Sequence, residues 1–404
     1  MTVADGDAAA AVRRAVEAVS DPELRRPLGE LDMVRDISVA DGVARVAIAL
    51  TIVGCPAADR IQRDVHAAAA RAPGIDSVQV ELGVMTSAER AALTARLRGG
   101  RAVRQMPFGP DSLTRVIAVT SGKGGVGKST VTANLAVALA RRGLAVGLID
   151  ADVHGFSIPA LLGLVGDDGL PPQPTRLDDL MLPPVAHGVK TISIGMFLPR
   201  GTDSRGADSR GTDSSGRSSR DGSPGAVAWR GPMLHRTVQQ FLTDVFFGDL
   251  DVLLIDMPPG TGDVAISVGQ LLPHAEILVV TTPQPAAADV AVRSGVVARQ
   301  TGQRVIGVVE NMAALTLPDG TTLDLFGAGG GVAVAAALSA AGDAVPLLGS
   351  VPLSPALRAA GDAGEPVVIG RPDDPAAQAI DAIAETLAAG GRSLVGRPLP
   401  VSPA

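Results

Sequence analysis

One glycine-rich segment constrains the fold of this chain more than any other feature of its sequence: Ser121-Gly-Lys-Gly-Gly-Val-Gly-Lys-Ser-Thr130. It fits the phosphate-loop pattern, in which a glycine, four further residues and a second glycine precede lysine and serine. The apolar residues 115–120 before it predict a buried strand, and residues 128–142 after it predict a helix whose N-terminus faces the loop. The sequence therefore predicts a strand, loop and helix unit that binds a nucleoside triphosphate.

The residue types in this loop have chemical reasons to face phosphate. Glycines leave consecutive backbone N–H groups open toward phosphate oxygens. The Lys128 ammonium is expected to reach the β- and γ-phosphates, and the Ser129 hydroxyl is expected to ligate Mg²⁺. The residues predicted to bind the nucleotide are Gly122, Lys123, Gly124, Gly125, Val126, Gly127, Lys128, Ser129 and Thr130.

Three aspartates follow predicted strands beyond this loop. Asp150 and Asp152 come after the apolar run 145–149, and Asp256 ends the run 252–255, as a Walker B carboxylate does. The carboxyl ends of parallel strands meet at one edge of a sheet, so these side chains are expected beside the phosphate loop. We predict that Asp256 binds Mg²⁺ and that Asp152 orients the attacking water. Asp150 either contacts the metal through water or braces the loop.

Length and composition restrict the class of protein. The 404 residues suffice for two or three domains, and 46% hydrophobic against 19% charged residues indicates a globular protein. The formal net charge of −7 predicts no surface for nucleic acid. No apolar run approaches the ~20 residues of a membrane span. The N-terminal residues also lack the basic segment followed by an apolar segment that is typical of a signal peptide. A single cysteine cannot form an intrachain disulfide, which agrees with a cytoplasmic protein. Together with the charge and the hydropathy, this predicts no membrane or nucleic-acid partner.

The pattern of strands and turns predicts two domains. Residues 8–97 predict a small α+β domain that includes a hairpin around Asp41-Gly42. A linker follows at 98–112. Residues 113–390 repeat strand, glycine turn and helix, which predicts an α/β P-loop ATPase domain with a parallel, doubly wound sheet. Residues 391–404 are expected to form a flexible tail.

Residues 200–225 interrupt the second domain with a tract of arginine, glycine, serine and aspartate that begins as a five-residue repeat. The tract has no apolar residue able to offset the entropy lost on ordering, so we predict a disordered insert. Lengthening a surface loop costs little free energy, which favours a tolerated repeat expansion without a function of its own.

The second lysine of the phosphate loop, Lys123, departs from the ordinary pattern. A lysine directly after the first glycine resembles the deviant Walker A motif of the MinD/ParA class of ATPases. The resemblance implies an ATP-dependent homodimer in which Lys123 reaches the partner's nucleotide and neutralises transition-state charge, as an arginine finger does. The alternative is a solvated loop lysine. Lys123, Lys128 and Asp152 are thus the predicted catalytic residues.

Longer motifs point to one family. They occupy residues 121–130, 150–159, 229–233, 256–263, 282–284, 310–312 and 326–331. Together they resemble the Mrp/ApbC family of cytoplasmic P-loop ATPases, which carry iron–sulfur clusters to apo-proteins. Segments at 21–24, 31–34 and 54–61 are similar to a small iron–sulfur assembly domain often fused upstream. The resemblance implies apo-protein clients and assembly factors as partners. It also implies that Asn311 recognises the adenine base, although a turn cap is as reasonable.

One feature of that family is missing from the sequence. The family's bridging cluster is usually held by a Cys-x-x-Cys pair shortly after the segment at 310–312, and this chain has no cysteine there. Alternating leucines on both sides of Pro318-Asp319-Gly320 predict a hairpin with ordinary turn chemistry in that place. Thiolates normally hold iron–sulfur clusters, and the aspartates near this turn are poor substitutes.

Cys55 is the one remaining thiol. It precedes a helix predicted to begin near Ala57, so it either has a lowered pKa and ligates iron or accepts a persulfide, or is a small buried apolar residue. Two functions stay open: an ATP-dependent iron–sulfur cluster carrier, and an ATP-switched adaptor that holds no cluster. A positioning ATPase is less well supported, because the C-terminal segment is no basic amphipathic helix. A ligase or kinase lacks a recognisable acceptor pocket.

Overall fold

The computed structural model describes residues 3–52, 55–98, 106–153, 155–197, 231–317 and 319–390. The predicted insert at 200–225 and the predicted tail at 391–404 lie outside the described residues, as do residues 99–105 of the linker at 98–112. At the end of that linker, Phe108 is buried and its ring meets Phe247 edge-on at 6.0 Å between centroids.

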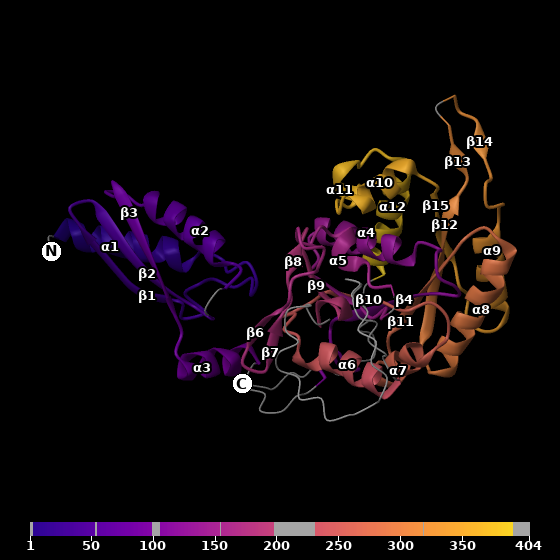
Figure 1. The fold of residues 1–404 in the computed structure, drawn as a ribbon, viewed down its shortest axis with the longest axis horizontal. Coiled ribbons are helices and arrows are strands. Elements are labelled where there is room, and N and C mark those ends of the chain that lie inside the picture. Colours follow the sequence, from indigo (N-terminus) through magenta and orange to yellow (C-terminus); the bar gives the residue numbers. More distant parts are fainter. Residues whose placement is uncertain are drawn as a thin grey trace, which may run out of the picture.

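The N-terminal part is a three-stranded sheet covered by helices (Figure 1). The Asp41-Gly42 turn joins β1 to β2 as an antiparallel hairpin, and both turn residues have positive φ, as a tight two-residue hairpin requires. The predicted hairpin is therefore confirmed. Strand β3 pairs with β2 in parallel after the crossover through α2. The elements are α1 (Val3–Glu17), β1 (Val34–Ala40), β2 (Val43–Leu50), α2 (Ala58–Ala70), β3 (Ser77–Val84) and α3 (Ser87–Leu97).

The larger part is built on an eight-stranded sheet with the order β15-β12-β11-β4-β10-β5-β9-β8. All neighbouring strands are parallel except β8, which pairs with β9 in antiparallel. The strands are β4 (Arg115–Ser121), β5 (Val146–Asp150), β8 (Val185–Ala186), β9 (Val189–Ser193), β10 (Val252–Asp256), β11 (Glu276–Thr281), β12 (Arg304–Ala313) and β15 (Leu347–Pro352).

Helices cover both faces of this sheet because its strands are apolar on both sides. Val116 and Ala118 of β4 join one buried cluster, whereas Ile117 and Val119 join the other. Helices α6 (Gly231–Asp244), α7 (Asp263–Leu271), α8 (Pro285–Gln300) and α9 (Gly330–Ala340) pack on the first face. The second face carries α4 (Lys128–Arg141), α5 (Ile158–Leu161), α10 (Pro355–Asp362), α11 (Val367–Gly370) and α12 (Pro375–Ala389). The predicted parallel, doubly wound α/β fold is confirmed.

A hairpin that was not predicted from the sequence joins the two parts. It consists of β6 (Thr175–Leu177) and β7 (Leu180–Leu182), and its leucines are buried in the apolar cluster of the N-terminal part. The hydroxyl of Thr175 donates to Glu23 at 2.9 Å, and Arg98 of the N-terminal part pairs with Asp179 at 2.5 Å. Figure 1 shows α3 beside this hairpin. A short 3₁₀ helix, η1 (Ile194–Phe197), follows β9.

A second hairpin, β13 (Leu315–Thr316) with β14 (Thr322–Leu323), projects from the body of the larger part between β12 and α9 (Figure 1). It is the hairpin predicted where the related family carries cysteines. Its turn is closed by a hydrogen bond from the Leu317 N–H to the Thr321 carbonyl at 2.8 Å, and Asp319 accepts from the Thr321 N–H at 2.9 Å. Aspartate and glycine thus supply ordinary turn chemistry here.

Among the described residues, no helix combines the length and the apolar composition that crossing a bilayer requires.

Candidate functional site

The glycine-rich loop leaves the carboxyl end of β4, between β11 and β10, and leads into α4. Gly125 and Gly127 have φ near +79° and +78°. A residue with a side chain would be strained in this left-handed backbone conformation. A side chain at Gly122 would overlap the backbone of α8, and one at Gly127 would overlap the Asn311 amide. Close approach by neighbouring elements therefore favours glycine at positions 122 and 127, and backbone conformation favours it at positions 125 and 127.

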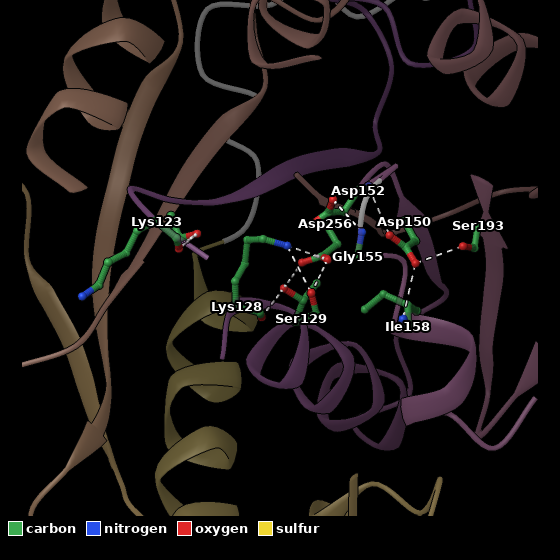
Figure 2. A network of polar contacts seen from close by, with 11 residues as sticks. Lys123, Lys128, Ser129, Asp150, Asp152, Gly155, Ile158, Ser193 and Asp256 are labelled. Carbon is green, nitrogen blue, oxygen red and sulfur yellow. Dashed lines mark hydrogen bonds and ion pairs between the residues drawn. The ribbon is translucent and has the colours of Figure 1, made fainter. Parts of the chain in front are cut away.

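Lys128 and Ser129 meet Asp256 at the start of α4 (Figure 2). The Lys128 Nζ lies 2.6 Å from Asp256 Oδ2, and the Ser129 hydroxyl donates to the same oxygen at 2.6 Å. Asp256 is fully buried and Lys128 is 6% exposed. The predicted lysine, serine and Walker B carboxylate are thus brought together by the pairing of β10 with β4.

Thr132 completes the surroundings of Asp256, and the sequence analysis missed it. Its hydroxyl donates to Asp256 Oδ1 at 2.9 Å, so both carboxylate oxygens are engaged. Thr132 lies four residues after Lys128, one turn along the same face of α4. The helical spacing is the signal that could have identified it.

Asp150 braces the segment that follows β5. Its carboxylate accepts from the N–H groups of Asp152 at 3.2 Å and Ile158 at 3.3 Å, and from the Ser193 hydroxyl at 3.0 Å (Figure 2). Burial, together with the charge of the neighbouring Asp256, raises the pKa of Asp150 well above the usual range. Of the two expected roles, these contacts favour the brace. Ser193 carries no sequence signal for this role, because only the pairing of β9 with β5 brings it here.

Asp152 lies just beyond the end of β5 and is 7% exposed. Its Oδ1 accepts from the Gly155 N–H at 3.2 Å, which holds the turn after the strand. Asp150 of β5 is the register partner of Asp256 in the adjacent strand β10. Asp152 therefore lies two residues beyond the level of Asp256, at the same edge of the sheet.

Lys123 has a different position from Lys128. Figure 2 shows its side chain pointing away from the Lys128 ammonium. Its Nζ donates to Gln284 Oε1 at 3.1 Å, and its carbonyl accepts from the Ser121 hydroxyl at 3.1 Å. The Lys123 ammonium therefore lies apart from the cluster formed by Lys128, Ser129 and Asp256.

The loop after β10 lies against the glycine-rich loop. The Gly260 N–H donates to the Ser121 carbonyl at 2.8 Å, and Gly260 has φ near +85°. A segment placed here is next to any phosphate held by the loop, as expected for a switch segment.

Asn311 also contacts the glycine-rich loop. Its side-chain amide donates to the Val126 carbonyl at 2.9 Å. Beside it lies a cavity of about 430 Å³, which is large enough for a nucleoside. Its lining includes Gly127, Thr130, Asn311, Met312, Leu353 and Leu357.

Cys55 lies in the N-terminal part and takes no part in this site. It is 7% exposed, and burial raises the pKa of its thiol to about 11. Of the two alternatives for Cys55, these properties favour the small buried apolar residue, because desolvation outweighs the hydrogen bonds at the start of α2. The described residues contain no group of three or more His, Cys, Asp or Glu side chains arranged to hold a metal ion.

We expect Cys55 to react slowly with iodoacetamide. A shift of the pKa from 9.0 to about 11 leaves roughly a hundredfold less thiolate at pH 8, and the thiolate is the reactive form. The rate of alkylation, followed by mass spectrometry, should rise to that of a free cysteine in denaturant. Native labelling as fast as in denaturant would show that the thiol is accessible and ionised.

Comparison with known proteins identifies the family. The model of the NUBPL iron-transfer P-loop NTPase family matches residues 112–207 and 218–388, which is more than half of the chain. This chain belongs to that family. A second model, for an iron-sulfur cluster assembly protein, matches residues 9–82 of the same NUBPL-family chain. The two matches confirm the resemblance drawn from the motifs and make the chain a P-loop NTPase.

Similar proteins cover nearly the whole length of this NUBPL-family member. The iron-sulfur cluster carrier protein of Mycobacterium tuberculosis (strain ATCC 25618 / H37Rv) is 52% identical over 402 residues, 99% of this chain and 98% of the relative. The protein of the same name from Mycobacterium leprae is 50% identical over 400 residues, 98% and 97% of the two chains. A solved nucleotide-binding protein from Archaeoglobus fulgidus in complex with ADP is 34% identical, covers 62% of this chain and 86% of its own, and has a TM-score of 0.44.

Proposed function

We propose that this chain is a homodimeric ATPase that carries iron–sulfur clusters to target apo-proteins. The observation that carries the proposal is the convergence of Lys128, Ser129 and Asp256 at the end of β4 and β10. A lysine, a hydroxyl and a buried carboxylate at a helix N-terminus are what a triphosphate and its metal require. The cluster role comes from the relatives, which are named iron-sulfur cluster carrier proteins.

The residues around Asp256 fit Mg²⁺. The Ser129 hydroxyl and an Asp256 oxygen lie 2.6 Å apart, and both are hard oxygen donors of the kind that this metal prefers. Bound with ATP, Mg²⁺ would neutralise charge on the phosphates. We expect the Lys128 ammonium to move from Asp256 to phosphate oxygens, which leaves the carboxylate free as a ligand.

The base of the nucleotide would occupy the cavity beside Asn311. Its volume of about 430 Å³ and its apolar lining suit a planar ring. Asn311 lines the cavity and its side-chain amide donates to the glycine-rich loop, so in a bound nucleotide it would lie between the base and the phosphates. This placement supports the assignment of Asn311 to nucleotide binding.

Hydrolysis would use Asp152 and the lysine of a second copy. Asp152 lies at the sheet edge next to the Walker B position, where it can orient a water molecule toward the γ-phosphate. The Lys123 side chain points away from its own Lys128, so its ammonium is available to a partner's nucleotide. Exposed apolar side chains support a dimer on this side of the fold: Leu325, just after the projecting hairpin, is 59% exposed and Val332 of α9 is 58% exposed.

The partners we propose are apo iron–sulfur proteins and iron–sulfur assembly factors, in the cytoplasm. The match of residues 9–82 to an iron-sulfur cluster assembly protein supports the second group. Nucleic acid and membranes are not proposed as partners, because the net charge of −7 disfavours polyanions.

A second function, an ATP-switched adaptor that holds no cluster, is favoured by one observation. The projecting hairpin has turn residues in place of a cysteine pair, and the remaining thiol, Cys55, is buried with a raised pKa. A dimer would supply two Cys55 thiolates at most, so a four-thiolate cluster would need thiols from a client or a small molecule.

Anaerobic reconstitution with iron and sulfide distinguishes the two functions. Iron and labile sulfide per dimer are counted in the wild type and in Cys55→Ala, together with ATPase activity. The carrier function predicts that the wild type binds a labile cluster, and loss of that cluster in Cys55→Ala, with ATPase unchanged, would assign Cys55 as one of its ligands. A cluster that survives in Cys55→Ala would keep the carrier function and reject Cys55 as its ligand. Absence of a cluster in both proteins, with ATPase intact, would overturn the carrier in favour of the adaptor.

A further inference from the structure

The N-terminal end of α8 supports the Lys123 side chain. Gln284 directly precedes α8, and its Oε1 accepts a hydrogen bond from the Lys123 ammonium at 3.1 Å. We propose that Gln284 is a positioning residue, which holds Lys123 in the direction required to reach the nucleotide of a second copy of this chain. The inference rests on the proposed function, in which Lys123 acts on the partner's nucleotide.

The backbone of Gln284 is fixed by its place in the chain. Gln284 is extended, with φ −63° and ψ +130°, and Pro285 follows it at the first position of the helix. A residue before proline is restricted to this extended region, and proline has little freedom itself. The Gln284 side chain therefore starts from a rigid point.

The glycine-rich loop and α8 are packed too closely to move independently. A side chain on Gly122, the residue before Lys123, would overlap the backbone of Val290 and Ala291 in α8. The backbone of Lys123 therefore stays in register with the helix that carries Gln284. The hydrogen bond between Lys123 and Gln284 thus links the glycine-rich loop to the start of α8, two elements that already pack tightly against each other.

The segment before Gln284 is held from the other side by α9. A Cβ on Gly330 would lie 2.5 Å from the Thr282 carbonyl oxygen and 2.6 Å from that of Pro283, so only glycine permits this contact. Glu310, 6% exposed, anchors the same helix end: its Oε2 accepts from the Gly331 N–H at 2.6 Å. The buried glutamate of β12 thus supports Gln284 through the glycine-rich start of α9.

The chemistry suits a positioning role. A lysine ammonium has three donors, so the bond to Gln284 leaves two for phosphate oxygens. A free lysine side chain would lose its rotamer freedom when it reaches the transition state, whereas one held by Gln284 has already lost much of it. Loss of the Gln284 oxygen should therefore lower kcat and leave the KM for ATP nearly unchanged.

Steady-state ATP hydrolysis by the full chain tests this role. Gln284→Met keeps the length of the side chain but removes the acceptor, and we expect kcat to fall about tenfold, the lower end of what one hydrogen bond to a charged group contributes. Gln284→Glu retains an oxygen at the same reach and should stay within about threefold of the wild type. Gln300→Met, at the exposed far end of α8, is the matched control and should have no effect.

A double-mutant cycle separates positioning from a general structural defect. In the Lys123→Ala background, Gln284→Met should cause no further loss of kcat, because the residue it positions is gone. A further tenfold loss in that background, or a Gln284→Met enzyme as fast as the wild type, would overturn the inference. If Lys123→Ala itself retains full activity, the proposed role of Lys123 fails, and the role of Gln284 fails with it.

Discussion

Replacement of Lys128 by alanine is expected to abolish ATP hydrolysis. The side chain is the cation closest to Asp256 and Ser129, at 2.6 Å and 3.2 Å, and in the proposed mechanism it transfers to the β- and γ-phosphates. Electrostatic stabilisation of transferring phosphate is the main catalytic contribution in this class of reaction. Release of inorganic phosphate under saturating ATP measures the effect. Turnover equal to that of the wild type would reject the assignment of the glycine-rich loop.

The same substitution also affects stability, and a second variant separates the two effects. Lys128→Ala leaves Asp256 fully buried without its cation, and breaking such a pair typically costs ~3–5 kcal/mol. The double variant Lys128→Ala/Asp256→Asn removes both charges and should recover most of the free energy of unfolding, measured in denaturant. It should still be inactive. Recovery of hydrolysis in the double variant would mean that Lys128 acts only on folding.

Lys123→Ala is expected to bind ATP normally and to lose hydrolysis. Its side chain points away from Lys128 and so contributes nothing to holding the nucleotide in its own subunit. A cation supplied in trans to a transferring phosphoryl group is worth ~10³-fold or more in kcat. Equilibrium binding of a fluorescent ATP analogue and single-turnover hydrolysis measure the two properties. Hydrolysis at the wild-type rate would leave Lys123 as a solvated loop lysine.

Mixing two inactive variants shows whether Lys123 acts in trans. In a heterodimer of Lys123→Ala with Asp152→Ala, one of the two sites has an intact Asp152 and receives Lys123 from the other subunit. Partial recovery of activity on mixing is therefore expected. If Lys123 acted within its own subunit, neither site of the heterodimer would be complete and mixing would restore nothing.

The strand, loop and helix around the phosphate loop could be predicted nearly to the residue. Residues 115–120 and 128–142 correspond to β4 (Arg115–Ser121) and α4 (Lys128–Arg141). A continuous apolar run before the glycines and a run of good helix formers after them leave few other local structures. The hairpin at Pro318-Asp319-Gly320 was predictable for the same reason, because its turn residues determine the local backbone.

The hairpin β6–β7 and the strands β8 and β9 were not predicted. Each has five residues or fewer, and their side chains form no long apolar run or clear alternation. Short strands are stabilised by the partners they pair with, so their sequences carry a weak signal. Ser193, at the end of β9, was missed as a partner of Asp150 for this reason.

The sequence alone determined the glycine-rich loop, the aspartates at the strand ends and the lack of a cysteine pair after the segment at 310–312. These depend on residue type and on local order along the chain. Only the tertiary structure decided that Cys55 is buried with a raised pKa, that Asp150 braces a loop and that Lys123 meets Gln284. Desolvation and side-chain partners are set by residues remote in the sequence, such as Gln284, which lies 161 residues beyond Lys123.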